Sequence, residues 1–140
     1  MIALAALLAV HTGCAGDGTQ EPESQIPLEP TLPAIQANIF TPVCAVPGCH
    51  AGAGAPLGQR LDSVADSFNS IVGVLSVERS DLMLYRVDPG DPDNSYLVWK
   101  IEGRPDIEGA RMPLGQPPLS QEQISAVREW IQNGAPEAPP

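Results

Sequence analysis

The chain has 140 residues, of which 43% are apolar and only 4% are aromatic. It carries 17 acidic and 7 basic residues, which gives a net charge of −10 at pH 7. This length predicts one small domain with a modest core, and the acidic balance disfavours nucleic acids and anionic membrane surfaces as partners.

The N-terminal segment has the pattern of a secretory leader. Residues 2–10 are apolar but too few to span a bilayer, which takes about 20 residues, and they suit the apolar region of a signal peptide. His11-Thr12-Gly13-Cys14 follows and is similar to the cleavage motif of bacterial lipoproteins, in which the cysteine is acylated. No basic residue precedes the apolar run, which a truncated leader would explain, and His11 stands where a small aliphatic residue is usual. We expect a lipoprotein-type signal peptide over residues 1–13 and lipidation of Cys14, with simple secretion as the alternative.

The next segment differs in composition from the rest of the chain. Residues 14–32 combine Pro, Gly and acidic residues with few apolar ones, so they are expected to form an unfolded acidic tether. The folded domain is expected over residues 33–136, with a short tail over residues 137–140.

Apolar residues at helical spacing predict an all-α domain with long loops. No alternating pattern typical of strands is evident. Pro33 suits the first turn of a helix, and Pro42 is expected to end that helix. The later helices are expected over Leu61 to Val74, from an Asp91 cap and Pro92 to Gly103, and from the capping box Ser120–Gln123 to Asn133-Gly134.

Two cysteines and a histidine lie between the first two of these helices. Cys44 and Cys49 are followed at once by His50, the only histidine after the leader. This arrangement can fix haem covalently, because each sulfur forms a thioether with one vinyl group while the imidazole reaches the iron. The usual spacer between the cysteines has two residues, and this one has four. Pro47-Gly48 predicts a type II turn, whose ends lie within about 7 Å, so both sulfurs can still meet the porphyrin edge.

A methionine lies in a loop rich in Pro and Gly, 62 residues after His50. Met112 stands in the run Arg111–Gly115, and its thioether could approach iron from the face opposite the histidine. The alternative is that Met112 fills a gap in the core, which is the usual role of a methionine. Met83 lies in an apolar run and is expected to be core.

Taken together, these residues resemble the small class I c-type cytochromes, and most closely the lipoprotein or periplasmic domains of Gram-negative bacteria. The resemblance covers about residues 33 to 135. The matching residues are Ile39–Pro42, Cys44, Cys49, His50, Arg86–Asp93, Ser95–Leu97, Lys100, Gly103, Arg111–Gly115, Pro118–Ser120 and Trp130–Ala135.

The resemblance implies a small cytochrome c-like helical fold with long loops around a haem pocket, in which the first and last helices contact each other. It implies one covalent haem c attached to Cys44 and Cys49, with His50 as the proximal and Met112 as the distal iron ligand. The implied function is electron transfer and not enzymatic catalysis. Donors to the haem propionates could be Tyr96, Trp99 and Arg111, each of which could equally be ordinary surface or core.

The implied setting follows from charge and from the leader. An acidic electron carrier is expected to dock on a basic patch of a redox partner. Lipid on Cys14 would attach the protein to a membrane, in the periplasm or at the cell surface of a Gram-negative bacterium.

Two alternatives remain open from the sequence alone. Cys44 and Cys49 could form a disulfide in a haem-free structural or binding lipoprotein. Otherwise the two cysteines, His50 and Met112 could bind copper, whose cuprous form suits thiolate and thioether ligands.

Overall fold

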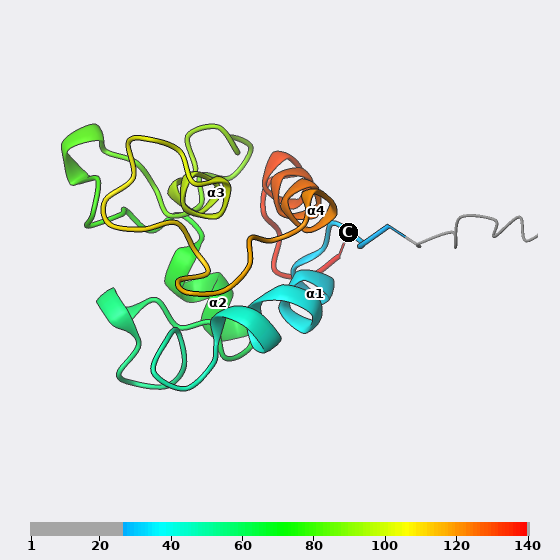
Figure 1. The fold of residues 1–140 in the computed structure, drawn as a ribbon. Helices are drawn as coiled ribbons and strands as arrows, with labels where there is room; N and C mark the ends of the chain where they lie inside the picture. Colours follow the sequence, from blue (N-terminus) through cyan, green and yellow to red (C-terminus); the bar gives the residue numbers. More distant parts are fainter. Residues whose placement is uncertain (1–26, 140) are drawn as a thin grey trace, which may run out of the picture.

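A computed structural model describes residues 27–139 and shows helices joined by long loops (Figure 1). The helices are α1 (Leu32–Ile35), which continues as the π-helix η1 (Gln36–Cys44), α2 (Val64–Ile71), α3 (Tyr96–Glu102) and α4 (Gln121–Gln132). Two short 3-10 turns, η2 (Pro56–Gly58) and η3 (Ser80–Leu82), lie in the loops. Extended pairing in the described part of the chain is limited to three isolated bridges in the segments between α2 and α3. The expectation of an all-α domain is confirmed.

The first helix begins as expected but ends later. The hydroxyl of Thr31 caps it by accepting a hydrogen bond from the amide of Ala34 at 3.4 Å. The prediction that Pro42 ends this helix is wrong, because Pro42 lies inside η1, which runs to Cys44. The ring of a proline clashes with the carbonyl four residues earlier in a regular α-helix, and the wider turns of η1 accommodate it. Cys44 is therefore the last residue of a helix and not a loop residue.

The helix α2 is shorter than predicted at both ends. It begins after Ser63, whose hydroxyl accepts from the amide of Asp66 at 3.1 Å. It ends before Val72, which is extended, and the amide of Gly73 donates to the carbonyl of Val87 at 2.9 Å. Pairing with the distant Val87 therefore replaces the last turn that the apolar pattern predicts.

The helix α3 also begins later than predicted. Asp91 does not cap it: its carboxylate accepts from the amide of Asn94 at 3.2 Å and stabilises a turn before the helix. The predicted end is confirmed, because Gly103 follows the helix with φ +72°, a left-handed conformation that glycine adopts without steric cost.

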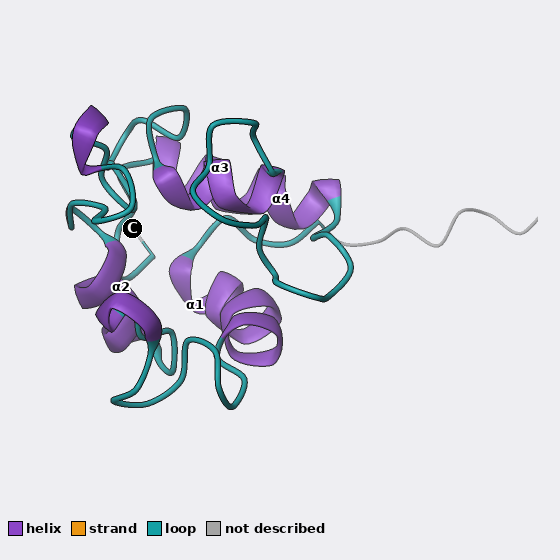
Figure 2. Ribbon diagram, turned by 60° about the vertical axis from the view of Figure 1, so that its left-hand side comes forward, coloured by secondary structure: helices purple, strands orange, loops and turns teal. Residues whose placement is uncertain are grey.

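The last helix, α4, matches its prediction most closely. Ser120 and Gln123 form the expected capping box, and Asn133 caps the C-terminus. Figures 1 and 2 both show α4 beside α1, and the two helices are in contact. Buried side chains of α1, η1 and α4 share one core: Leu32, Ile35, Ile39, Phe40, Ile124, Val127, Trp130 and Ile131.

The folded unit begins ahead of residue 33. Leu32 is fully buried, and Leu28 packs against the core while its amide donates to the Glu122 carboxylate at 2.9 Å. At the other end, the indole of Trp130 donates to the carbonyl of Pro136 at 2.9 Å. The predicted signal peptide, Cys14 and most of the tether lie outside the described residues.

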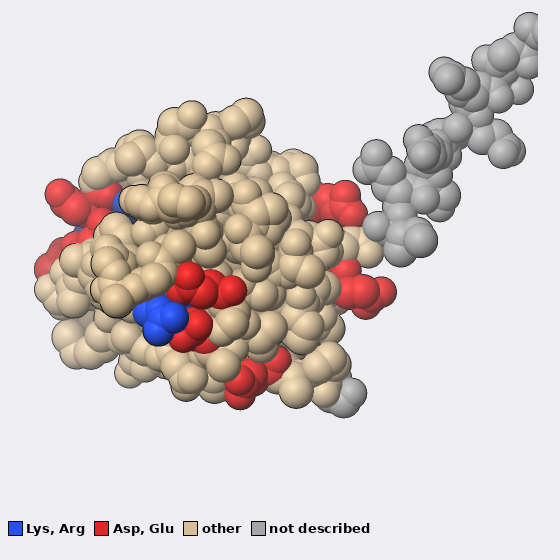
Figure 3. All heavy atoms as spheres, turned by 90° about the horizontal axis from the view of Figure 1, so that it is seen from below, with Lys and Arg blue, Asp and Glu red and all other residues tan. Residues whose placement is uncertain are grey.

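The surface of the described part is acidic. On the face shown in Figure 3, acidic side chains outnumber basic ones, and the basic side chains visible there border acidic ones. Arg60, for example, pairs with both Asp62 and Asp66 at 3.2 Å. Over residues 27–139 no helix has the length and apolar character needed to cross a membrane.

Candidate cofactor site

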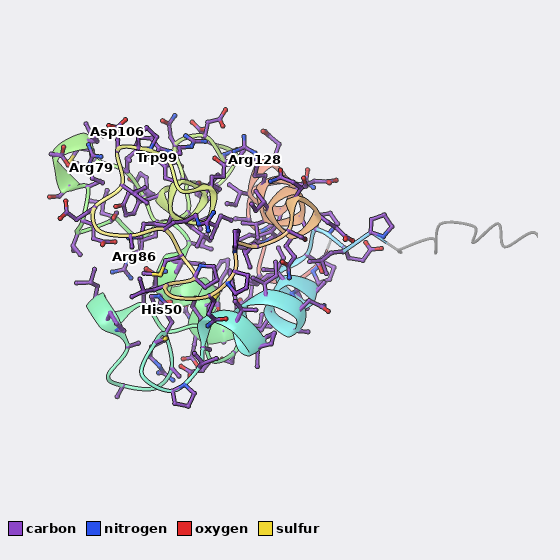
Figure 4. All side chains as sticks on the ribbon, in the orientation of Figure 1. His50, Arg79, Arg86, Trp99, Asp106 and Arg128 are labelled. Carbon is purple, nitrogen blue, oxygen red and sulfur yellow. The ribbon has the colours of Figure 1, made fainter. Side chains whose placement is uncertain are left out.

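A pocket lies among the end of η1, the loop that follows it, α3 and the loop before α4. All four side chains predicted to hold a cofactor line it, and they come from two distant segments: Cys44, Cys49 and His50 from one, and Met112 from the other. Its apolar wall is formed by Val43, Leu57, Leu61, Leu97, Ile101, Leu114 and Leu119. Figure 4 places His50 close to Arg86, which lines the same pocket.

The pocket is small, and two exposed leucine side chains lie at its mouth. Its volume is about 190 Å³, below the range of roughly 300–1,000 Å³ that is typical of sites for small molecules. Leu57 and Leu114 line it but are 57% and 64% exposed, so they form its rim. A larger flat ligand would need these two exposed side chains to turn outward.

The two cysteines are held close to the histidine by a tight turn. The amide of Cys49 donates to the carbonyl of Val46 at 3.0 Å, and Gly48 has φ +84°, as the predicted type II turn requires. The amide of His50 donates back to the carbonyl of Cys44 at 3.1 Å. The four-residue spacer is thereby folded on itself. Cys44 and Cys49 are both half-buried free thiols.

His50 is fixed by its backbone and by its ring. Its carbonyl accepts from the amide of Leu61 at 2.8 Å, and its Nδ1 lies 3.0 Å from the carbonyl of Gln59. A carbonyl can only accept, so the proton of the neutral ring is on Nδ1 and the Nε2 lone pair is free. A metal-binding histidine is commonly oriented by such a hydrogen bond.

Met112 lies on the opposite segment of the pocket wall. Its side chain is half buried, and its amide donates to the carbonyl of Lys100, in the last turn of α3, at 2.9 Å. Met83, in contrast, is 66% exposed and lies outside the pocket. The expectation that Met83 is core is therefore wrong, because Met83 follows η3 in a left-handed turn on the surface.

The cysteine at the helix end is held in its protonated form. Burial raises the pKa of the Cys44 thiol to about 12, and the nearby Cys49 adds to this rise. At neutral pH Cys44 is therefore a thiol. Metals bind the thiolate form of cysteine.

A polar wall of the pocket was not predicted from the sequence. Arg86 is only 8% exposed, and its guanidinium donates to the carbonyls of Ser70 and Leu57 at 2.7 Å each. No ion pair involves Arg86 among the described residues, although Glu78 lies on the same wall. Burial lowers the pKa of Arg86, and Glu78 opposes that change. The sequence signal was a single cation inside the apolar run Leu84–Val87.

The predicted propionate donors are placed differently from one another. Tyr96 lines the pocket, and its hydroxyl accepts from the amide of Glu108 at 2.8 Å. Trp99 does not line it, because its indole donates to the carbonyl of Asp93 at 2.6 Å on the outer surface. Arg111 is exposed and is not part of the wall.

The pocket is not a preformed cage for a bare metal ion. Within residues 27–139, no three side chains of His, Cys, Asp and Glu converge as ligands of one metal would. The two thiols and the imidazole therefore share a pocket without pointing at a common centre.

Comparisons of the chain with protein-family models, with curated proteins and with solved structures found no match.

Proposed function

We propose that this protein is an electron carrier of the c-type cytochrome kind, with one covalent haem c in the pocket. The observation that carries the proposal is that Cys44, Cys49, His50 and Met112 line one pocket although Met112 lies 62 residues after His50. Two thiols, one imidazole and one thioether are the donor set that such a haem requires. The small cytochrome c-like fold is proposed on the same ground.

Each side chain has a defined task in this proposal. The thiols of Cys44 and Cys49 would add across the two vinyl groups, so that sulfur bonds one carbon and the thiol hydrogen passes to the other. His50 would bind iron through Nε2, since its Nδ1 is committed to the carbonyl of Gln59. Met112 would be the second axial ligand. When bound, the haem supplies one-electron chemistry at its iron, and the chain supplies the axial ligands and an apolar surrounding.

The copper alternative has less support. Copper binds a thiolate, and burial opposes that ionisation at Cys44. The lack of a converging ligand group in residues 27–139 points the same way.

Arg86 supplies a reason for a ligand that carries carboxylates. A buried guanidinium without a carboxylate partner is costly, and the Arg86 guanidinium donates two hydrogen bonds, to Ser70 and Leu57, although it carries five donor hydrogens. A haem propionate could pair with the remaining donors.

The test is the visible spectrum of protein made in a host that attaches c-type haem. We expect an intense Soret band that survives acid-acetone extraction. Colourless protein in which Cys44 and Cys49 are bonded to each other would overturn the proposal and favour the disulfide alternative. Colourless protein that retains stoichiometric copper would favour the copper site.

The axial ligand is tested by replacing Met112. Met112→Ala should remove the weak near-infrared sulfur–iron band and lower the reduction potential. Met83→Ala is the matched control, because this exposed methionine lies outside the pocket. A Met112→Ala protein with an unchanged spectrum would remove Met112 from the site.

We further propose that the protein is anchored by lipid on Cys14 in the periplasm or at the cell surface and meets a basic redox partner. All seven basic residues lie in residues 27–139, and five of them, Arg60, Arg79, Lys100, Arg104 and Arg128, pair with carboxylates. The excess charge is therefore negative, which favours a basic docking surface. Cys14→Ser should release the protein from membranes. Continued membrane association would argue against acylation at Cys14.

A further inference from the structure

The loop that carries Met112 is attached to a single face of α3. The amide of Glu108 donates to the Tyr96 hydroxyl at 2.8 Å, and the Lys100 ammonium donates to the carbonyl of Glu108 at 2.7 Å. The amide of Met112 then donates to the carbonyl of Lys100 at 2.9 Å. Three hydrogen bonds thus fix the loop at two points, one of which is Met112 itself.

A fourth contact closes the same loop at the end of α3. A Cβ atom added to Gly103 would lie 2.6 Å from Cδ of Arg111, so the Arg111 side chain packs directly over the glycine. No other residue type would allow this approach together with the positive φ of Gly103. Arg111, the residue before Met112, therefore packs against the C-terminal end of α3.

These contact points follow the helical repeat. Tyr96 and Lys100 are spaced i, i+4, which places them on one face of α3, and Gly103 caps the end of the helix. Tyr96 and Lys100 also line the pocket, as Met112 does, so these residues border both the loop and the cofactor position. We call these three residues the α3 face.

Lys100 is unusually buried for a lysine. It is 8% exposed, lies 3.5 Å from the Glu78 carboxylate and stands over the ring of Tyr96. A buried ammonium is kept only where its charge is compensated and its hydrogens are bonded. The Glu78 carboxylate compensates the charge of Lys100. The hydrogen bond to the Glu108 carbonyl binds one ammonium hydrogen and also fixes the loop.

We infer that the α3 face is a positioning device that holds the Met112 thioether at the iron, with Lys100 and Tyr96 acting as positioning residues. This inference rests on the proposed function for its ligand. The attachment of the loop to α3 is a property of the polypeptide and can be measured separately.

The experiment combines trypsin and the near-infrared spectrum on the full chain as purified. Trypsin does not cleave the Arg104–Pro105 bond, so the exposed Arg111 is the cleavage site within this loop, and its products are identified by mass. Lys100→Met should raise the rate of cleavage after Arg111 about tenfold, because a hydrogen bond from a charged donor is lost and cleavage follows the open population. Tyr96→Phe, which retains the ring, should raise it about fivefold.

In haem-loaded protein both variants should keep the Soret band and weaken the near-infrared sulfur–iron band. Arg128→Met is the matched control: it removes one charge from the ion pairs to Asp93 and Glu102 on the outer surface and should change neither readout. Wild-type cleavage rates in both α3-face variants, or a full near-infrared band in both, would overturn the inference. Wild-type protein without a Soret band would instead overturn the proposed function, and the cleavage rates would still decide whether the α3 face holds the loop.

Discussion

The two halves of the molecule share one apolar core but differ in the other contacts that stabilise them. In the half that contains α1 and α4, apolar side chains fill the interior, and Trp130 is 0% exposed. In the half that contains the pocket, polar side chains bind the carbonyls of loops: His50 approaches Gln59, Arg86 binds Leu57 and Lys100 binds Glu108.

This difference shows how a small chain can keep a pocket open. Apolar packing would fill the space between the loops, because interiors pack to the density of organic crystals. Hydrogen bonds to backbone carbonyls fix the loops at defined points and leave the space between them free. We therefore expect the apolar packing between α1 and α4 to contribute more to the free energy of unfolding than the hydrogen bonds around the pocket do.

The largest expected effect is in the packed half. Trp130→Ala should lower the free energy of unfolding by about 3–5 kcal/mol, the cost of removing a large buried aromatic side chain. Chemical denaturation of the purified domain measures this change. Trp99→Ala is the control, since Trp99 is partly exposed and should cost clearly less. Equal costs at the two sites would remove the contrast between the halves.

Cys44 lies at the border of the two halves, and its titration is a second test. Its pKa in the folded protein is about 12, against an ordinary value of 9.0. The folded state therefore holds a proton that the unfolded state loses, so the free energy of unfolding should fall as pH rises from 9 towards 12. The slope should approach about 1.4 kcal/mol per pH unit.

The measurement compares protein with free thiols and its Cys44→Ala variant by chemical denaturation at each pH. The variant should lack the fall that Cys44 produces. Protein with a thioether at Cys44 should lack it too, because no thiol remains to ionise. A fall of equal slope in the Cys44→Ala variant would show that other groups cause it.

Arg86→Met tests the half that contains the pocket. The substitution retains much of the buried side chain but removes both hydrogen bonds, to Ser70 and Leu57. The free energy of unfolding should fall by about 1–3 kcal/mol, and amide exchange should speed up around η2 more than in α4. Exchange that speeds up equally in both places would show that the halves unfold together.

The parts of the fold that were predictable depend on neighbours in sequence. The capping box of α4 and the left-handed glycine after α3 need only residues a few positions apart, and both were predicted. The turn at Gly48 is equally local. These local features predicted where α3 ends and how the spacer between the cysteines folds.

The parts that were missed depend on distant residues. The carbonyls that Arg86 binds lie 16 and 29 residues away in the sequence, and no local pattern indicates them. The late start of α3 was missed for a different reason, because its contacts are local: the hydroxyl of Ser95 accepts from the amide of Asp88 and donates to the carbonyl of Asp91, and this turn competes with the predicted cap at Asp91. The four cofactor residues were chosen by chemical type, and only the fold could place Met112 in the pocket of His50.

The smallest expected effect is on the outer surface, where α3 and α4 are joined by ion pairs. Arg128 lies 2.6 Å from the Asp93 carboxylate and 3.0 Å from that of Glu102. Both partners are reached by water, so Arg128→Ala should lower the free energy of unfolding by less than about 1 kcal/mol, and by less still in high salt. Denaturation at low and high salt measures both values. A cost as large as that of Arg86→Met that falls in high salt would mean that surface charge, and not only backbone hydrogen bonding, holds α3 in place beside the pocket.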